Sequence, residues 1–125
     1  MAERNGTAAK IARTYIEAMA NKDVDAIVKI SAEDVVCISP IGTITGMQAF
    51  RGFQDGFARM LKKMDVLAVY GDDEQAVIVY QVETHPVPHS IVAELIKIKD
   101  GKIASSQVIY DPTPYAAYMA TIKQP

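Results

Sequence analysis

Residues 66–111 read VLAVYGDDEQAVIVYQVETHPVPHSIVAELIKIKDGKIASSQVIYD, and this stretch decides the fold. β-Branched and aromatic residues dominate it, and turn-forming residues interrupt it at Gly71–Asp73, Pro86–His89 and Asp100–Gly101. The pattern predicts antiparallel strands joined by turns. Most residues before it follow a helical period instead, apart from two short β segments around Pro40 and Gly42. We therefore expect an α+β domain in which N-terminal helices pack on a mostly antiparallel sheet.

Three helices are predicted before this sheet. Thr7 can cap a first helix and Asp23 a short second one. Thr45 and Gln48 have the spacing of a capping box and can open a third helix. The first helix then places one stripe of core residues on a single face, namely Ile11, Tyr15, Ala18 and Met19.

The third helix combines a large apolar face with two glycines. Gly52 and Gly56 lie four residues apart, and each costs a helix roughly 1 kcal/mol relative to alanine. Either a closely packed backbone or a ligand would explain them, and a tight helix–sheet contact is our expectation. The apolar residues at helical spacing are Phe50, Phe53, Phe57, Met60, Leu61 and Met64.

Composition excludes several classes of protein. The 125 residues suffice for one domain, residues 1–125, and the net charge of −2 with no basic block argues against a nucleic-acid partner. Cys37 is the only cysteine, so a disulfide within the chain is impossible. No apolar run is long enough to span a membrane, and MAERNGTAAK, residues 1–10, lacks the apolar core of a signal peptide. We expect a cytoplasmic protein.

The hairpin between the two central strands decides which side chains share a face. If Pro86–His89 forms the loop and His85 pairs with Ser90, then Gln81 lies opposite Glu94. One face would then be apolar at one end and carry Gln81, Glu83, His85 and Glu94 at the other. The opposite face would be apolar, and we expect a second copy of the chain to cover it in a homodimer. That face holds Ile78, Tyr80, Val82, Ile91, Ala93 and Leu95.

The polar end of the first face has two readings. An apolar pocket with a few convergent polar groups is typical of a small-molecule site. Alternatively, these side chains sit at the end of the sheet and are simply solvated. No metal site is expected, because the prolines between His85 and His89 preclude the helix that would bring two histidines four apart together.

Two segments resemble a known superfamily. ARTYIEAMANKDVDAIVKISAEDVVCISPIGTITGMQAF, residues 12–50, and KDGKIASSQVIYD, residues 99–111, resemble the nuclear transport factor 2-like superfamily. Within it the chain looks most like the small ketosteroid isomerases and the polyketide cyclase-type (SnoaL-like) proteins. The resemblance implies a curved sheet and helices that enclose a cone-shaped, mostly apolar pocket, commonly in dimers.

The resemblance also shows which catalytic groups are absent. Ketosteroid isomerases use a tyrosine, a general base and a protonated acid. By position these fall on Tyr15, Ser39 and Ile96. Serine is no base near neutral pH and isoleucine cannot donate a hydrogen bond, so that mechanism is excluded. The Arg-x-Asp of related epoxide hydrolases is also missing from AELIKI, residues 93–98.

The remaining candidates for catalysis are Glu94, His85 and Tyr15. A carboxyl group desolvated on an apolar wall can act as acid or base near neutrality, and histidine titrates there unaided. Asp111 fits either a cap for a short last helix or the late aspartate of polyketide cyclase-type proteins. The candidate ligand-binding residues are Cys37, Ser39, Phe53, Phe57, Gln81, Glu83, Ile96 and Tyr110.

Two functions from different classes follow. The first is a cofactor-free isomerase, cyclase or lyase that moves a proton next to the carbonyl group of a small apolar molecule. The second is a non-catalytic module for binding an apolar ligand or for dimerisation, which has lost the ketosteroid isomerase acids. The sequence does not indicate which molecule is the substrate.

Overall fold

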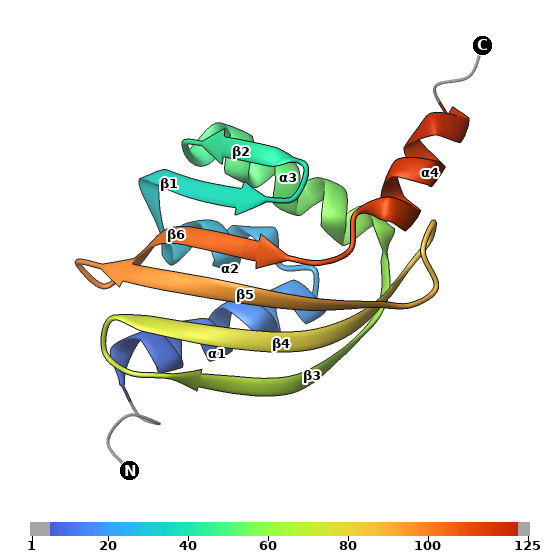
Figure 1. Ribbon diagram of the computed structural model, residues 1–125. Coiled ribbons are helices and arrows are strands. Elements are labelled where there is room, and N and C mark those ends of the chain that lie inside the picture. Colours follow the sequence, from blue (N-terminus) through green and yellow to red (C-terminus); the bar gives the residue numbers. More distant parts are fainter. Residues whose placement is uncertain (1–5, 123–125) are drawn as a thin grey trace.

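The computed structural model describes residues 6–122, which form an α+β domain as predicted (Figure 1). The N-terminal segment that lacks the apolar core of a signal peptide, residues 1–10, lies partly outside this range, since residues 1–5 are not described. Among residues 6–122, no helix is long and apolar enough to cross a membrane. In chain order the elements are α1 (Thr7–Ala20), α2 (Val24–Lys29), β1 (Ser31–Ser39), β2 (Gly42–Thr45), α3 (Met47–Met60), β3 (Leu61–Gly71), β4 (Gln75–Thr84), β5 (Ser90–Lys99), β6 (Lys102–Ile109) and α4 (Thr113–Ile122).

The six strands form one curved, mixed sheet in the order β2-β1-β6-β5-β4-β3. Neighbouring strands are antiparallel except β1 and β6, which are parallel. Helices α1, α2 and α3 cover one face, called here the inner face, while α4 projects beyond the end of β6 (Figure 1). The core therefore lies between the inner face and the three N-terminal helices.

Of the caps predicted for the three N-terminal helices, only that of α2 is confirmed. The Asp23 side chain accepts from the backbone N–H of Ala26 at 3.2 Å. Helices α1 and α3 begin instead after Gly6 and Gly46, with no side-chain cap. The start of α1 is held by the β3–β4 turn, where the carbonyl oxygen of Asp72 accepts from the first turn of the helix. Tertiary contact thus replaces the cap that Thr7 was expected to supply.

Helix α3 is shorter than predicted. It ends at Met60, and Leu61 and Met64 belong to β3. Pairing with β4 begins at once, since Leu61 lies opposite Thr84. Leu61 is still buried in the same core, which explains why the apolar spacing continued across the boundary.

The predicted register of β4 and β5 is wrong by three residues. Gln81 pairs with Ile91 rather than with Glu94, and Glu94 pairs with Ile78. The loop is longer than expected because Thr84 turns the chain early. Its N–H and hydroxyl both donate to the carbonyl oxygen of Val87, at 2.9 and 3.1 Å, and Val87 is buried.

This shift changes which residues of β4 share a face with Glu94. Glu94 lies on the inner face, whereas Gln81, Glu83 and His85, which were predicted beside it, do not share that face with it. Half of the predicted dimer face turns inward, since Ile78, Tyr80 and Val82 are buried in the core.

The outer face of the sheet still carries exposed apolar side chains on neighbouring strands. Ile91 is 53% exposed, and Ile109 of β6 follows the same face because it pairs with Ala93. Further along the sheet the same face holds Val77 of β4, which pairs with Leu95 on one side and with Tyr70 of β3 on the other, and Tyr70 is 69% exposed.

Gly71 ends β3 at a position that has no room for a side chain. A Cβ there would lie 2.6 Å from the Cβ of Ala76 and 2.7 Å from the carbonyl oxygen of Gln75. We expect Gly71→Ala to lower the free energy of unfolding by about 2 kcal/mol, because the β3–β4 turn must shift. Urea unfolding measures this, with Lys63→Ala on the exposed part of β3 as the control. A Gly71→Ala protein as stable as that control would contradict the packing of this turn.

Candidate active site

A cavity of about 370 Å³ lies between the inner face, α1, α3 and α4. Its walls are mainly aromatic and aliphatic, and its few polar side chains come from Tyr15, Gln54, Glu94 and other tyrosines. The size and composition are typical of a small-molecule pocket. The lining residues are Tyr15, Met19, Ile41, Gly52, Phe53, Gln54, Gly56, Phe57, Met60, Tyr80, Val92, Glu94, Val108, Tyr110, Tyr115 and Tyr118.

Glu94 is the centre of a buried hydrogen-bonded cluster, called here the Glu94 cluster. Its Oε1 accepts from the Tyr15 hydroxyl and from the Ser106 hydroxyl, both at 2.8 Å. Its Oε2 accepts from the Tyr80 hydroxyl. The amide Nε2 of Gln54 donates to the Tyr15 hydroxyl oxygen at 3.3 Å. Both carboxyl oxygens are therefore satisfied by neutral donors.

Five elements bring these side chains together. Alternation along β5 places Glu94 between the inward-facing Val92 and Ile96, and β4 and β6 flank it with Tyr80 and Ser106. The other two members of the cluster, Tyr15 and Gln54, come from the buried faces of α1 and α3. The site depends on the tertiary fold and not on any local motif.

Burial dominates the electrostatics of the cluster. Glu94 is 1% exposed, and this desolvation raises its pKa, while the hydroxyls of Tyr80, Ser106 and Tyr15 oppose the rise by stabilising the carboxylate. Burial and the neighbouring Glu94 raise the pKa of both Tyr15 and Tyr80 well above the usual tyrosine value. The two tyrosines are therefore neutral hydrogen-bond donors, and Glu94 is the group that can exchange a proton.

Of the three predicted catalytic residues, the structure brings together Glu94 and Tyr15. His85 is exposed and packs edge-on against the Tyr118 ring, with 6.1 Å between ring centroids. Its predicted neighbours lie away from the cavity too. Glu83 Oε2 is 3.8 Å from the Lys62 ammonium group, and Gln81 Nε2 is 3.1 Å from Nδ1 of the exposed His89.

Apart from Gln81 and Glu83, the predicted ligand-binding residues divide into two groups. Phe53, Phe57 and Tyr110 line the cavity. Cys37, Ser39 and Ile96 do not.

Each residue of the second group has another place in the fold. Ile96 is fully buried in the core, and Ser39 closes the β1–β2 turn by donating to the carbonyl oxygen of Gly42. Cys37 is also buried, and burial together with nearby Glu94 raises the pKa of its thiol to about 12. The thiol is therefore protonated and a poor nucleophile.

Sequence reasoning missed three members of the cluster, Gln54, Tyr80 and Ser106. Tyr80 was placed on the outer face by the register error. Gln54 had a signal, since it lies four residues after the buried Phe50 on the same side of α3. Ser106 lies on the same face of β6 as the buried Val108.

The expected helix–sheet contact at Gly52 and Gly56 is wrong. A Cβ built at either glycine finds no heavy atom within 4 Å, and both residues line the cavity. Space, not close packing, surrounds them.

Asp111 takes the capping role. Its Oδ1 accepts from the backbone N–H of Thr113, the first residue of α4, at 3.0 Å, and this hydrogen bond lowers the pKa of Asp111. Asp111 is exposed and does not line the cavity.

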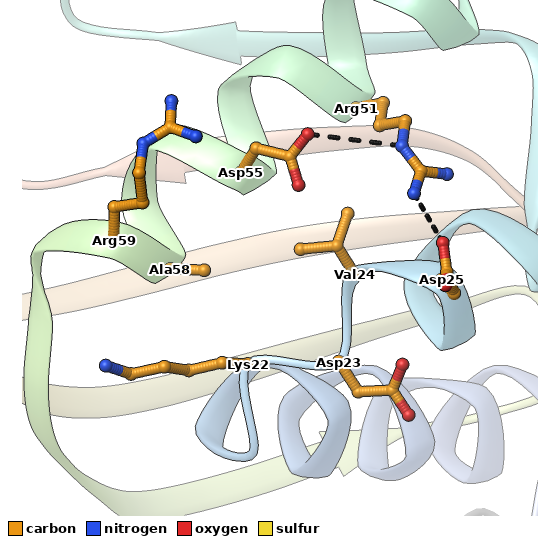
Figure 2. A pocket seen from close by; sticks show the side chains of 8 residues that line it. All are labelled: Lys22, Asp23, Val24, Asp25, Arg51, Asp55, Ala58 and Arg59. Atoms are coloured by element: carbon orange, nitrogen blue, oxygen red, sulfur yellow. Dashed lines mark hydrogen bonds and ion pairs between the residues drawn. The ribbon is translucent and has the colours of Figure 1, made fainter.

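A second depression lies between the α1–α2 turn and α3 (Figure 2). Arg51 connects its two sides, through ion pairs with Asp25 on α2 and with Asp55, at 4.0 Å, on α3. These side chains are largely exposed, and such surface ion pairs contribute little to stability or binding. Across residues 6–122, no three histidine, cysteine or acidic residues group closely enough to hold a metal ion.

A family model for the SnoaL-like domain matches residues 12–106. The chain belongs to the SnoaL-like family. The predicted resemblance to the SnoaL-like branch of the nuclear transport factor 2-like proteins is thus confirmed.

Solved structures agree on the fold. A protein from Kribbella flavida DSM 17836 is 36% identical over 94% of this chain and 98% of its own, with a TM-score of 0.86. An NTF2-like protein of unknown function from Mesorhizobium loti is 17% identical, over 86% and 93% of the two chains, with a TM-score of 0.77. An LEH-like epoxide hydrolase from M. tuberculosis is 13% identical, over 93% and 95%, with a TM-score of 0.72. The last two share the fold alone, and no curated protein matches the chain significantly.

Glu94 should give this SnoaL-like protein a distinctive pH dependence of stability. Its pKa is raised above the ordinary value of 4.5, so the folded state holds the proton more tightly than the unfolded chain. The contribution of Glu94 to folding is fully present below about pH 4.5 and is lost as the pH rises through the folded pKa.

The measurement is urea unfolding from pH 4 to pH 8 of the unsubstituted protein and of Glu94→Gln, which imitates the neutral acid. We expect the stability of the unsubstituted protein, relative to Glu94→Gln, to fall as the pH rises. The same comparison with Glu83→Gln controls for replacing a carboxyl group by an amide. A relative stability that stays constant across this range would contradict the raised pKa.

Proposed function

We propose that this SnoaL-like protein binds a small, uncharged, apolar carbonyl compound and moves a proton on it without a cofactor, as an isomerase, cyclase or lyase. The single observation that carries the proposal is the placement of Glu94. It is buried in the wall of an aromatic cavity, in contact with two tyrosine hydroxyls. Its raised pKa brings it closer to neutrality, where a general acid or base works best.

The chemistry follows from the hydrogen bonds of Glu94. As a carboxylate, it removes a proton from the carbon next to the carbonyl group. The C–H electron pair becomes a C=C bond, and the carbonyl π electrons move to the oxygen. Once protonated, Glu94 is a weaker acceptor, so the Tyr15 hydroxyl is free to donate to the developing enolate oxygen. Gln54 supports this step because it donates to the Tyr15 oxygen and leaves the hydroxyl proton available.

The charge of the cavity supports an uncharged substrate. Among residues 6–122, none of those that line it is lysine, arginine or histidine. A phosphate or carboxylate group inside would be desolvated next to Glu94 without a compensating cation, which is costly. The aromatic lining instead favours flat, apolar molecules.

A binding module without catalysis is the second candidate, and one observation favours it. Both oxygens of Glu94 already accept hydrogen bonds, and among residues 6–122 no buried side-chain nitrogen or oxygen lacks a partner. Glu94 would then hold the cluster together while the cavity carries a ligand unchanged. The two candidates differ in one observable, which is proton exchange on the bound ligand.

The distinguishing experiment uses 2-acetylnaphthalene, a neutral aryl methyl ketone, in heavy water. We expect the protein to accelerate exchange of the methyl protons, and Glu94→Gln to slow that exchange by about 100-fold while keeping the dissociation constant within a few-fold. Proton magnetic resonance follows the methyl signal, and Glu83→Gln, on the exposed outer side, is the matched control. Binding without exchange by the unsubstituted protein would instead support the binding module.

We also propose that a second copy of the chain covers the outer face of the sheet. The support is the set of exposed apolar residues on the outer face of four adjacent strands, Tyr70 of β3, Val77 of β4, Ile91 of β5 and Ile109 of β6. Contiguous apolar surface of this kind is typical of a subunit interface.

Sedimentation at micromolar concentration tests the dimer. We expect the unsubstituted protein to sediment as a dimer and Ile91→Glu as a folded monomer, since the charge would be buried unpaired. Ala58→Glu, on the charged side of α3, is the control and should leave the dimer intact. A monomeric unsubstituted protein would reject the proposal.

A further inference from the structure

Two glycines of α3 have no role in the fold itself. Gly52 and Gly56 sit inside the helix with ordinary backbone angles, unlike Gly42, Gly46 and Gly101, whose φ angles are positive. Helix geometry would therefore accept alanine at both positions, and alanine is the better helix former.

Packing does not require these glycines either. A Cβ at Gly52 or Gly56 would meet no heavy atom within 4 Å. The contrast is with Gly6 and Gly71, where a Cβ would lie 2.3 and 2.6 Å from its nearest neighbours. Those two glycines are needed for close contact, whereas the two in α3 border open space.

The open space is the cavity. Gly52 and Gly56 are four residues apart on the same side of the helix and both line the pocket, next to Phe53 and Phe57. Glu94 is buried, whereas Gly52 is exposed. A ligand that extends from Glu94 toward solvent therefore passes Gly56 and Gly52, where the backbone of α3 carries no side chain.

We propose that Gly52 and Gly56 determine specificity, by leaving room for the distal, flat end of the ligand against the backbone of α3. A side chain at either position would occupy that room. A ligand short enough to stay near Glu94 would not be affected, while a longer one would be excluded. The inference rests on the proposed function only in taking the cavity as the ligand site, and it does not require proton transfer.

The test compares two neutral ketones of different length, acetophenone and 2-acetylnaphthalene, by titration calorimetry. We expect Gly52→Ala and Gly56→Ala to weaken binding of 2-acetylnaphthalene by about tenfold and to leave binding of acetophenone within about twofold. Both variants should also melt about 3 °C higher, because alanine favours the helix. Ala58→Gly, on the opposite side of α3, is the matched control. It should melt lower and bind both ketones as the unsubstituted protein does.

Each contrary outcome has a distinct meaning. If the unsubstituted protein binds both ketones and the glycine variants bind 2-acetylnaphthalene equally well, the specificity role is wrong and the proposed function stands. Equal weakening of both ketones would also overturn it, because the glycines would then not select by length. If the unsubstituted protein binds neither ketone, the proposed function and this inference fail together.

Discussion

The burial of one carboxyl group constrains much of this structure. Glu94 is removed from water on the inner face of the sheet, where an unsatisfied carboxyl group would cost several kcal/mol. Three hydroxyl groups, from α1, β4 and β6, satisfy it. These donors converge only when the strands are in register and α1 lies across the sheet. The Glu94 cluster therefore links the position of the N-terminal helix to the pairing of three strands.

The same cluster faces an apolar cavity, so the buried carboxyl group is accessible to a ligand bound there. Phe53, Phe57 and three further tyrosines line the rest of the cavity and supply area for a flat ligand, and none of the described lining residues carries a positive charge. A carboxyl group whose pKa is raised by such surroundings is suited to taking and returning a proton. Gly52 and Gly56 agree with a ligand site in this cavity, since they lower the stability of α3 at the place where a ligand would need space.

The sequence predicted the helices and strands better than the way in which they pair and pack. The α+β class, the short helix after Asp23 and the pairing of Tyr15 with Glu94 as candidates followed from local patterns and from position. The β4–β5 register did not, because both strands are apolar on both faces, and such a pattern leaves alternation unable to choose between pairings. The deciding contact, Thr84 with Val87, lies inside a loop with two prolines.

Two further predictions from the sequence were wrong because contacts between distant parts of the chain decide the outcome. The cap expected at Thr7 is replaced by a contact with Asp72, which is distant in sequence. The close packing expected at the α3 glycines is replaced by a cavity, whose existence depends on all surrounding elements. Local sequence can suggest that a glycine is unusual, but only the assembled fold shows whether it borders protein or empty space.

The central claim is that a neutral ketone binds with its carbonyl group at the Glu94 cluster. A crystal structure of the protein with 2-acetylnaphthalene tests it most directly. We expect the carbonyl oxygen to lie about 2.6–3.2 Å from the Tyr15 hydroxyl, with the ketone's methyl carbon next to Glu94 and the second ring over α3. A ketone bound outside the cavity, or inside it with its carbonyl group directed away from Glu94, would contradict the proposed role of Glu94.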